Sequence, residues 1–170
     1  VIQRCQQLTG MLAGTMSHDN AYDFVRIGRN LERADMTTRV IDIGAMSLGE
    51  PDQRSGIDVH VWTSMLRAMN AYQMYRKHVQ IGVNFADVVR LLLQNSYFPR
   101  SVMHCMDSVE ECLGHLPRHQ ETFKALRSTR RHVDRIKPAS LDAEKLHREV
   151  DRLQIDISTI HDQIQTTWFE

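Results

Sequence analysis

FVRIGRNLERADMTTRVIDIGAMSL, residues 24–48, is the stretch that decides the fold of this chain. Its mainly apolar positions recur every three or four residues, and they are Phe24, Ile27, Leu31, Ala34, Thr38, Ile41, Ala45 and Leu48. This spacing places them on one side of an α-helix of about seven turns. Asp19 or Asn20 is suited to cap the start of this helix, and Gly49 with Pro51 is suited to end it.

The segments that follow show the same period. A loop is predicted over residues 49–56, and a second long helix is predicted from about Asp58 to Val79, where large apolar residues recur at helical spacing. Asn84 is suited to cap a short helix whose continuous apolar run, residues 88–93, is expected to be buried.

Three further helical segments are predicted after a break at residues 94–99. Apolar residues recur at heptad-like spacing over residues 102–116 and form a weaker stripe over 123–136. Ser140 is suited to cap the last helix, which continues to Trp168. Together with a helical first segment, these elements predict an all-α fold, an antiparallel bundle of about six to seven helices.

Length and charge limit the classes of function. The chain has 170 residues, of which 42% are hydrophobic, and this predicts one domain over residues 1–170 with its own core. Its 21 basic and 21 acidic residues cancel, so no general attraction to nucleic acid or to an anionic membrane is expected. No apolar run approaches the ~20 residues that cross a bilayer. Three cysteines without a disulfide or zinc spacing fit reduced thiols in a cytoplasmic protein.

The long helix carries a row of charged residues beside its apolar stripe. The row consists of Arg26, Arg29, Glu32, Arg33 and Asp35. One interpretation is a solvated face with weak ion pairs, such as Glu32 with Arg29 or Asp35 with Arg39. Gly28 favours the other interpretation, because glycine costs about 1 kcal/mol in a helix and suggests that another backbone lies close. In that case Arg29 and Glu32 would be partly buried and paired.

A second candidate site is the run Tyr97–Ser101, which precedes a helix. Pro99 is suited to the first turn of that helix, and Arg100 and Ser101 would lie near its N-terminal amides, where an anion could bind. The alternative is that Pro99 ends the preceding loop, that Phe98 anchors this loop in the core and that Arg100 pairs with a carboxylate. The second alternative is favoured, because no glycine-rich loop accompanies the run.

Metal and nucleophile patterns are weak. Cys112, His115 and His119 are the nearest approach to a ligand cluster, but Gly114 and Pro117 interrupt their helix, so no zinc spacing results. A di-iron bundle needs two Glu-x-x-His pairs that face inward. Only one such pair is present here, in the first turn of the last helix. No nucleophile elbow or phosphate loop occurs. We therefore expect no metal, no cofactor and no self-contained enzyme.

Three motifs in order resemble the bacterial alpha-E family, an all-helical domain family of unknown function named for a Glu-Arg motif. Residues 24–42 resemble its signature, with Glu32-Arg33 as the motif. Trp62–Ala68 resembles a W-x-x-x-L-R-A segment, and Leu91–Leu93 followed by Phe98–Val102 resembles its buried run and P-R-S motif. Family members usually contain two related helical halves, and this chain resembles the second half.

The resemblance also implies partners. Alpha-E proteins are typically encoded beside a circularly permuted ATP-grasp protein, often with a transglutaminase-like protease nearby. This setting implies an accessory or scaffold domain, itself not catalytic, in ATP-dependent peptide synthesis or tagging. Two alternatives remain open at this stage: part of a ligase or transferase site completed by the missing first half, or a purely structural helical domain. The binding candidates are the charged row and the turn of Pro99, Arg100 and Ser101.

Overall fold

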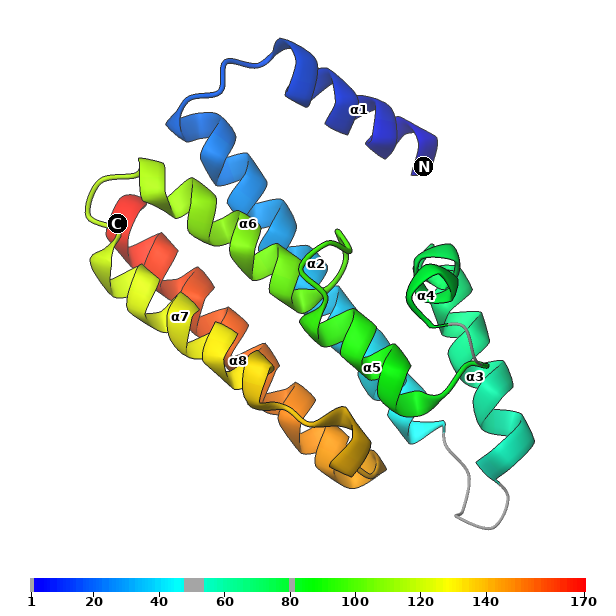
Figure 1. The fold of residues 1–170 in the computed structure, drawn as a ribbon. Coiled ribbons are helices and arrows are strands. Elements are labelled where there is room, and N and C mark those ends of the chain that lie inside the picture. The colour runs from blue at the N-terminus through cyan, green and yellow to red at the C-terminus, as the bar shows by residue number, and fades with distance from the viewer. Residues whose placement is uncertain (1, 48–53, 80–81) are drawn as a thin grey trace.

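All regular secondary structure is helical over the residues that the computed structural model describes, which are 2–47, 54–79 and 82–170 (Figure 1). The elements are α1 (Ile2–Thr15), α2 (Asn20–Met46), α3 (Arg54–Ala68), α4 (Tyr72–His78), α5 (Phe85–Gln94), α6 (Val102–His115), α7 (Gln120–Arg135), the short 3-10 helix η2 (Pro138–Ser140) and α8 (Ala143–Trp168). The described residues thus contain eight α-helices, where about six to seven were predicted, and the all-α prediction is confirmed. None of the described helices is long and apolar enough to cross a bilayer.

Four long helices form the centre of the fold. Helix α2 packs against α6 and α8, and α7 completes the group by packing against both α6 and α8 (Figure 1). Contacts near the helix ends show that neighbours run antiparallel: Phe24 at the start of α2 meets Trp168 at the end of α8. The stripe that predicted α2 is its core side, since Ile27, Ala34 and Ile41 are almost completely buried.

Helix starts follow from local capping chemistry. An Asp19 carboxylate oxygen accepts hydrogen bonds from the amides of Ala21 and Tyr22, at 3.0 and 3.3 Å, so the cap predicted for α2 is confirmed. Asn84 caps α5 as predicted. The predicted cap of the last helix was wrong by two residues, because Asp142 accepts from the Lys145 amide at 2.8 Å while Ser140 lies in η2.

The predicted helix from Asp58 to Val79 is in fact two helices, α3 and α4. Asn70 adopts the left-handed conformation with φ of 54°. Its amide donates to the Arg67 carbonyl and the next amide, of Ala71, donates to the Leu66 carbonyl, which is the hydrogen-bond pattern that closes a helix end. The apolar spacing passes through this break, so periodicity alone did not reveal it.

Helix α3 begins at Arg54, so the last part of the predicted 49–56 loop is helical. Gly49 and Pro51, which were predicted to end α2, lie outside the described residues. Helix α5 lies against α3 and η2, and its run from Val88 to Leu93 is buried as predicted, except for the exposed Arg90. Helix α1 extends from the N-terminal end of α2 and stands apart from the four central helices (Figure 1).

Candidate functional site

Arg33 of the Glu-Arg motif joins α2 to the turn before α6. One guanidinium nitrogen of this half-buried side chain lies 3.3 Å from the Pro99 carbonyl oxygen and 3.3 Å from Oδ1 of Asn30. One helical turn later, the buried Thr37 hydroxyl donates to the Arg100 carbonyl oxygen at 2.7 Å. Two motifs that are distant in sequence are therefore one structural unit, held by hydrogen bonds from α2 to the backbone of the turn.

Side chains at both ends of the turn, those of Asn95 and Ser101, also hold its backbone in place. Oδ1 of Asn95 accepts from the amides of Tyr97 and Phe98, at 2.9 and 2.8 Å. Phe98 is buried, which confirms its predicted role as an anchor. Ser101 caps α6 by accepting from the His104 amide at 3.1 Å, so α6 starts at Val102. Pro99 consequently lies before the helix, so the favoured interpretation, in which Pro99 ends the preceding loop, is confirmed.

Arg100 lies at the surface of the turn. Its side chain is exposed, and no carboxylate of the described residues forms an ion pair with it. The predicted pairing of Arg100 with a carboxylate is therefore not found within the described part of the chain. The turn holds the Arg100 backbone in place through Thr37 and leaves the guanidinium group in solvent.

Glu32 and Arg29 also point outward, on the side of α2 opposite the core. Glu32 is exposed and Arg29 is partly exposed, and neither forms an ion pair within the described part of the chain. The expected Glu32–Arg29 pair was wrong, whereas Asp35 and Arg39 do pair at 2.8 Å. The charged row is thus neither a continuous ladder of ion pairs nor a buried cluster.

The two glycines of α2 explain where another element does approach. A Cβ atom on Gly28 would meet nothing within 4 Å, and the residue is exposed, so the close packing predicted there was wrong. A Cβ atom on Gly44 would lie 2.4 Å from the Met65 sulfur and 2.9 Å from the Trp62 ring. Helix α3 is the element that requires a glycine in α2. It crosses α2 at Gly44, about four helical turns beyond Gly28.

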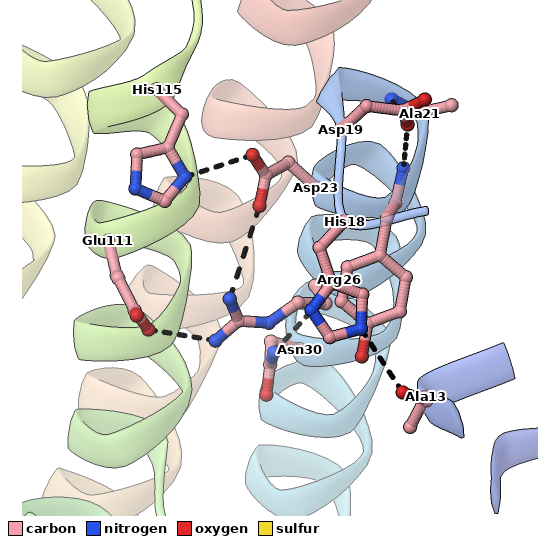
Figure 2. Close-up of polar contacts among 10 residues, drawn as sticks. Ala13, His18, Asp19, Ala21, Asp23, Arg26, Asn30, Glu111 and His115 are labelled. Atoms are coloured by element: carbon pink, nitrogen blue, oxygen red, sulfur yellow. Dashed lines mark hydrogen bonds and ion pairs between the residues drawn. The ribbon is translucent and has the colours of Figure 1, made fainter. Parts of the chain in front are cut away.

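Arg26 belongs to a separate polar cluster between α2 and α6 (Figure 2). Its guanidinium group lies 2.8 Å from a Glu111 carboxylate oxygen and 4.0 Å from the buried carboxylate of Asp23. The second oxygen of Asp23 lies 3.0 Å from Nδ1 of His115. Neither Asp23 nor Glu111 was predicted as a site residue from the sequence, and His115 was considered only as a weak candidate metal ligand. The sequence shows Asp23 three residues before Arg26. It does not show the register of α6 against α2, which brings Glu111 and His115 to the same place.

The thiols near these groups are not poised to act as nucleophiles. Burial raises the pKa of the Cys112 thiol, next to Asp23, to about 12. Burial likewise raises the pKa of Cys105, beside the Pro99 turn, to about 11. Near neutral pH both side chains are therefore protonated, and protonated thiols are poor nucleophiles and poor metal ligands. The cluster of Figure 2 is an ion-paired helix contact.

The two histidines that were considered as metal ligands contact other groups and not a shared site. His115 binds Asp23, and Nδ1 of His119 lies close to the Leu116 carbonyl oxygen. A different group gathers between α2 and α8, where Nδ1 of His147 lies 2.6 Å from Asp42 and its Nε2 lies 3.4 Å from Asp151. Asp151 lies on α8 like His147, so the imidazole links α8 to α2 through its hydrogen bond with Asp42, and a single ion could use only one of its ring nitrogens.

The large cavities lie away from the motif. One of about 730 Å³ lies beside α4 and α5, and one of about 470 Å³ lies between α7 and α8. Arg29, Glu32 and Arg100 line neither of them. A shared pocket for these three side chains would have favoured a catalytic role, and neither of these cavities provides one.

Comparison with known proteins gives one match. A family model described as "Alpha-E: A predicted alpha-helical domain with a conserved ER motif" matches residues 1–169. No curated protein and no solved structure is detectably similar to the chain.

Proposed function

This chain belongs to the Alpha-E family, and we propose that it is a non-catalytic accessory domain that docks an ATP-grasp-type peptide ligase through the outward face of α2. We define this face by Arg29, Glu32, Met36, Arg39 and Ile43. The identity of the partner follows from the family's typical setting beside ATP-grasp proteins. The surface is chosen from the geometry of the Glu-Arg motif, in which the arginine holds the fold and the glutamate points outward.

The observation that carries the proposal is the position of Glu32. Its neighbour Arg33 is occupied by the Pro99 turn, whereas Glu32 is exposed and has no ion-pair partner among the described residues. Stability alone does not require a glutamate there, because an unpaired charge in solvent contributes little to folding. A basic group on a docked protein would give Glu32 a partner and would also exclude water from the pair.

The composition of the outward face also fits an interface. Met36 is 52% exposed and Ile43 is 63% exposed, and both lie on the same side of α2 as Arg29 and Glu32. Methionine and arginine are enriched in protein interfaces, where apolar area contributes affinity and charges fix orientation. Arg100 projects from the turn that Arg33 and Thr37 hold against the same helix, so it can contribute to the rim of this surface.

The partner would supply the chemistry. Both buried thiols are protonated near neutral pH, and the sequence has no phosphate-binding loop. ATP-grasp enzymes bind nucleotide and metal themselves, so an accessory domain beside them needs only a binding surface. ATP-dependent peptide synthesis or tagging is the process in which we place it.

The test is co-purification with the ATP-grasp protein encoded beside the gene. We expect Glu32→Ala and Arg29→Ala to abolish co-purification without changing the helical circular dichroism signal or the melting temperature. Glu121→Ala is the control, because Glu121 is also exposed but lies on α7, where it pairs with Lys124. Retention of the partner by Glu32→Ala, or equal loss with Glu121→Ala, would overturn the proposal.

A further inference from the structure

Two facing rows of polar residues line an open cavity between α7 and α8, which measures about 470 Å³. From α7 the row consists of Ser128, Arg131, His132 and Arg135, which are spaced to share one side of the helix. From α8 it consists of Glu149, Arg152 and Asp156. The volume lies within the range of small-molecule sites.

His132 occupies both carboxylates of this cavity. Its Nδ1 lies 2.9 Å from Asp156 and its Nε2 lies 2.7 Å from Glu149, and the side chain is only 12% exposed. Both carboxylates of the cavity wall are therefore in contact with His132, each through a different ring nitrogen.

The three arginines of the cavity differ from the other arginines of α7. Arg127 and Arg130 bind carboxylates on α6: Arg127 lies 3.2 Å from Glu110, and Arg130 lies 2.6 Å from Asp107. No such pair is formed by Arg131, Arg135 or Arg152 with any carboxylate of the described residues. Three guanidinium groups from two helices therefore border one cavity without a counter-charge of their own.

We propose that this cavity binds a small molecule carrying at least two phosphate or carboxylate groups. The guanidinium group presents its donors in a planar fork that matches the oxygens of both anions. Three forks around one volume can hold more than one such group, and the Ser128 hydroxyl adds a donor. The site lies on the α7–α8 side of the bundle, whereas the proposed docking face is on α2, so the two proposals are independent.

Isothermal titration calorimetry at constant ionic strength tests the site, with pyrophosphate and citrate as the two probes. We expect saturable binding of at least one probe, and the stronger one identifies phosphate or carboxylate as the preferred group. Arg131→Gln, Arg135→Gln and Arg152→Gln should each weaken binding by about tenfold or more, since each removes a charge-assisted hydrogen bond.

Arg127→Gln is the matched control, because it removes an exposed arginine of the same helix that already has a carboxylate partner. It should leave the affinity within about twofold of that of the unmodified protein, the size expected of a screened surface charge. Circular dichroism and melting temperature check that the variants are folded. The proposal is overturned if neither probe binds saturably, or if Arg127→Gln weakens binding as much as the three cavity variants do.

Discussion

Similar charged residues have different roles on the two sides of α2. On the side next to α6, Arg26 and Arg33 are held by Glu111 and by the Pro99 carbonyl. On the outward side, Arg29 and Glu32 have no ion-pair partner within the described residues. The two glycines of α2 differ in the same way. Side chains of α3 cover Gly44, whereas a Cβ atom on Gly28 would meet no neighbour. One side of the helix therefore builds the fold, and the other is available for binding.

The largest expected effect of a substitution is on the packed side of α2. Gly44→Val should lower the free energy of unfolding by about 1–3 kcal/mol, because its side chain would overlap Met65 and the Trp62 ring. Urea denaturation measures this change. Gly28→Val is the matched control and should cause no loss, and equal losses at the two glycines would break the comparison.

Thr37 tests the link between α2 and the turn. Thr37→Val keeps the shape but removes the hydroxyl that donates to the Arg100 carbonyl oxygen, which should cost about 1–2 kcal/mol of unfolding free energy. Thr159→Val is the control, since that exposed hydroxyl donates only to a carbonyl of its own helix. If the Thr37 variant is as stable as the Thr159 variant, the turn is not held through α2.

Gly28 should show a gain. Gly28→Ala replaces glycine at an exposed helical position where the new Cβ atom meets no neighbour. We expect the melting temperature to rise, with a gain in stability of up to about 1 kcal/mol from helix propensity. A loss of stability would show that an element approaches Gly28 after all.

The smallest effect concerns His147, which bridges α2 and α8. Its hydrogen bond to Asp42 raises the pKa of the imidazole above the ordinary value. The bridge therefore contributes fully below the unfolded-state pKa of about 6.5 and is lost as pH rises through the raised folded-state pKa.

Melting temperatures at several pH values check the His147 bridge. The unmodified protein should melt above the His147→Gln variant at pH 5.5, and the difference should shrink steadily toward pH 9. A difference that stays constant with pH would mean that the charge of His147 does not stabilise the bundle.

Local patterns predicted much of the fold, for identifiable reasons. The three- and four-residue spacing of apolar residues predicted the core side of α2. The caps at Asp19 and Asn84 were predicted correctly, because a capping side chain binds amides only two or three residues away. The break at Asn70 was missed because the apolar spacing continues across it. Asp142 was missed as the cap of α8 because Ser140 offers similar chemistry two residues earlier.

The candidate site was only partly predictable, because its contacts join distant segments. The motif residues were found, but which of them face inward depends on the register of α2 against α6. The Asp23–His115 contact, 92 positions apart in sequence, and the α7–α8 cavity depend on the same kind of register. Gly28 suggested close packing on propensity alone, and the crossing of α3 lies at Gly44 instead.

We propose that Glu32 serves binding and that Arg33 serves the fold, and this division of roles can be tested directly. Its most direct test measures melting temperature and affinity for the ATP-grasp protein on the same samples of Glu32→Gln and Arg33→Gln. We predict that Glu32→Gln loses the partner at an unchanged melting temperature, whereas Arg33→Gln lowers the melting temperature by releasing the Pro99 turn. A Glu32→Gln protein that keeps the partner, or that melts as low as the Arg33→Gln protein, would contradict the account.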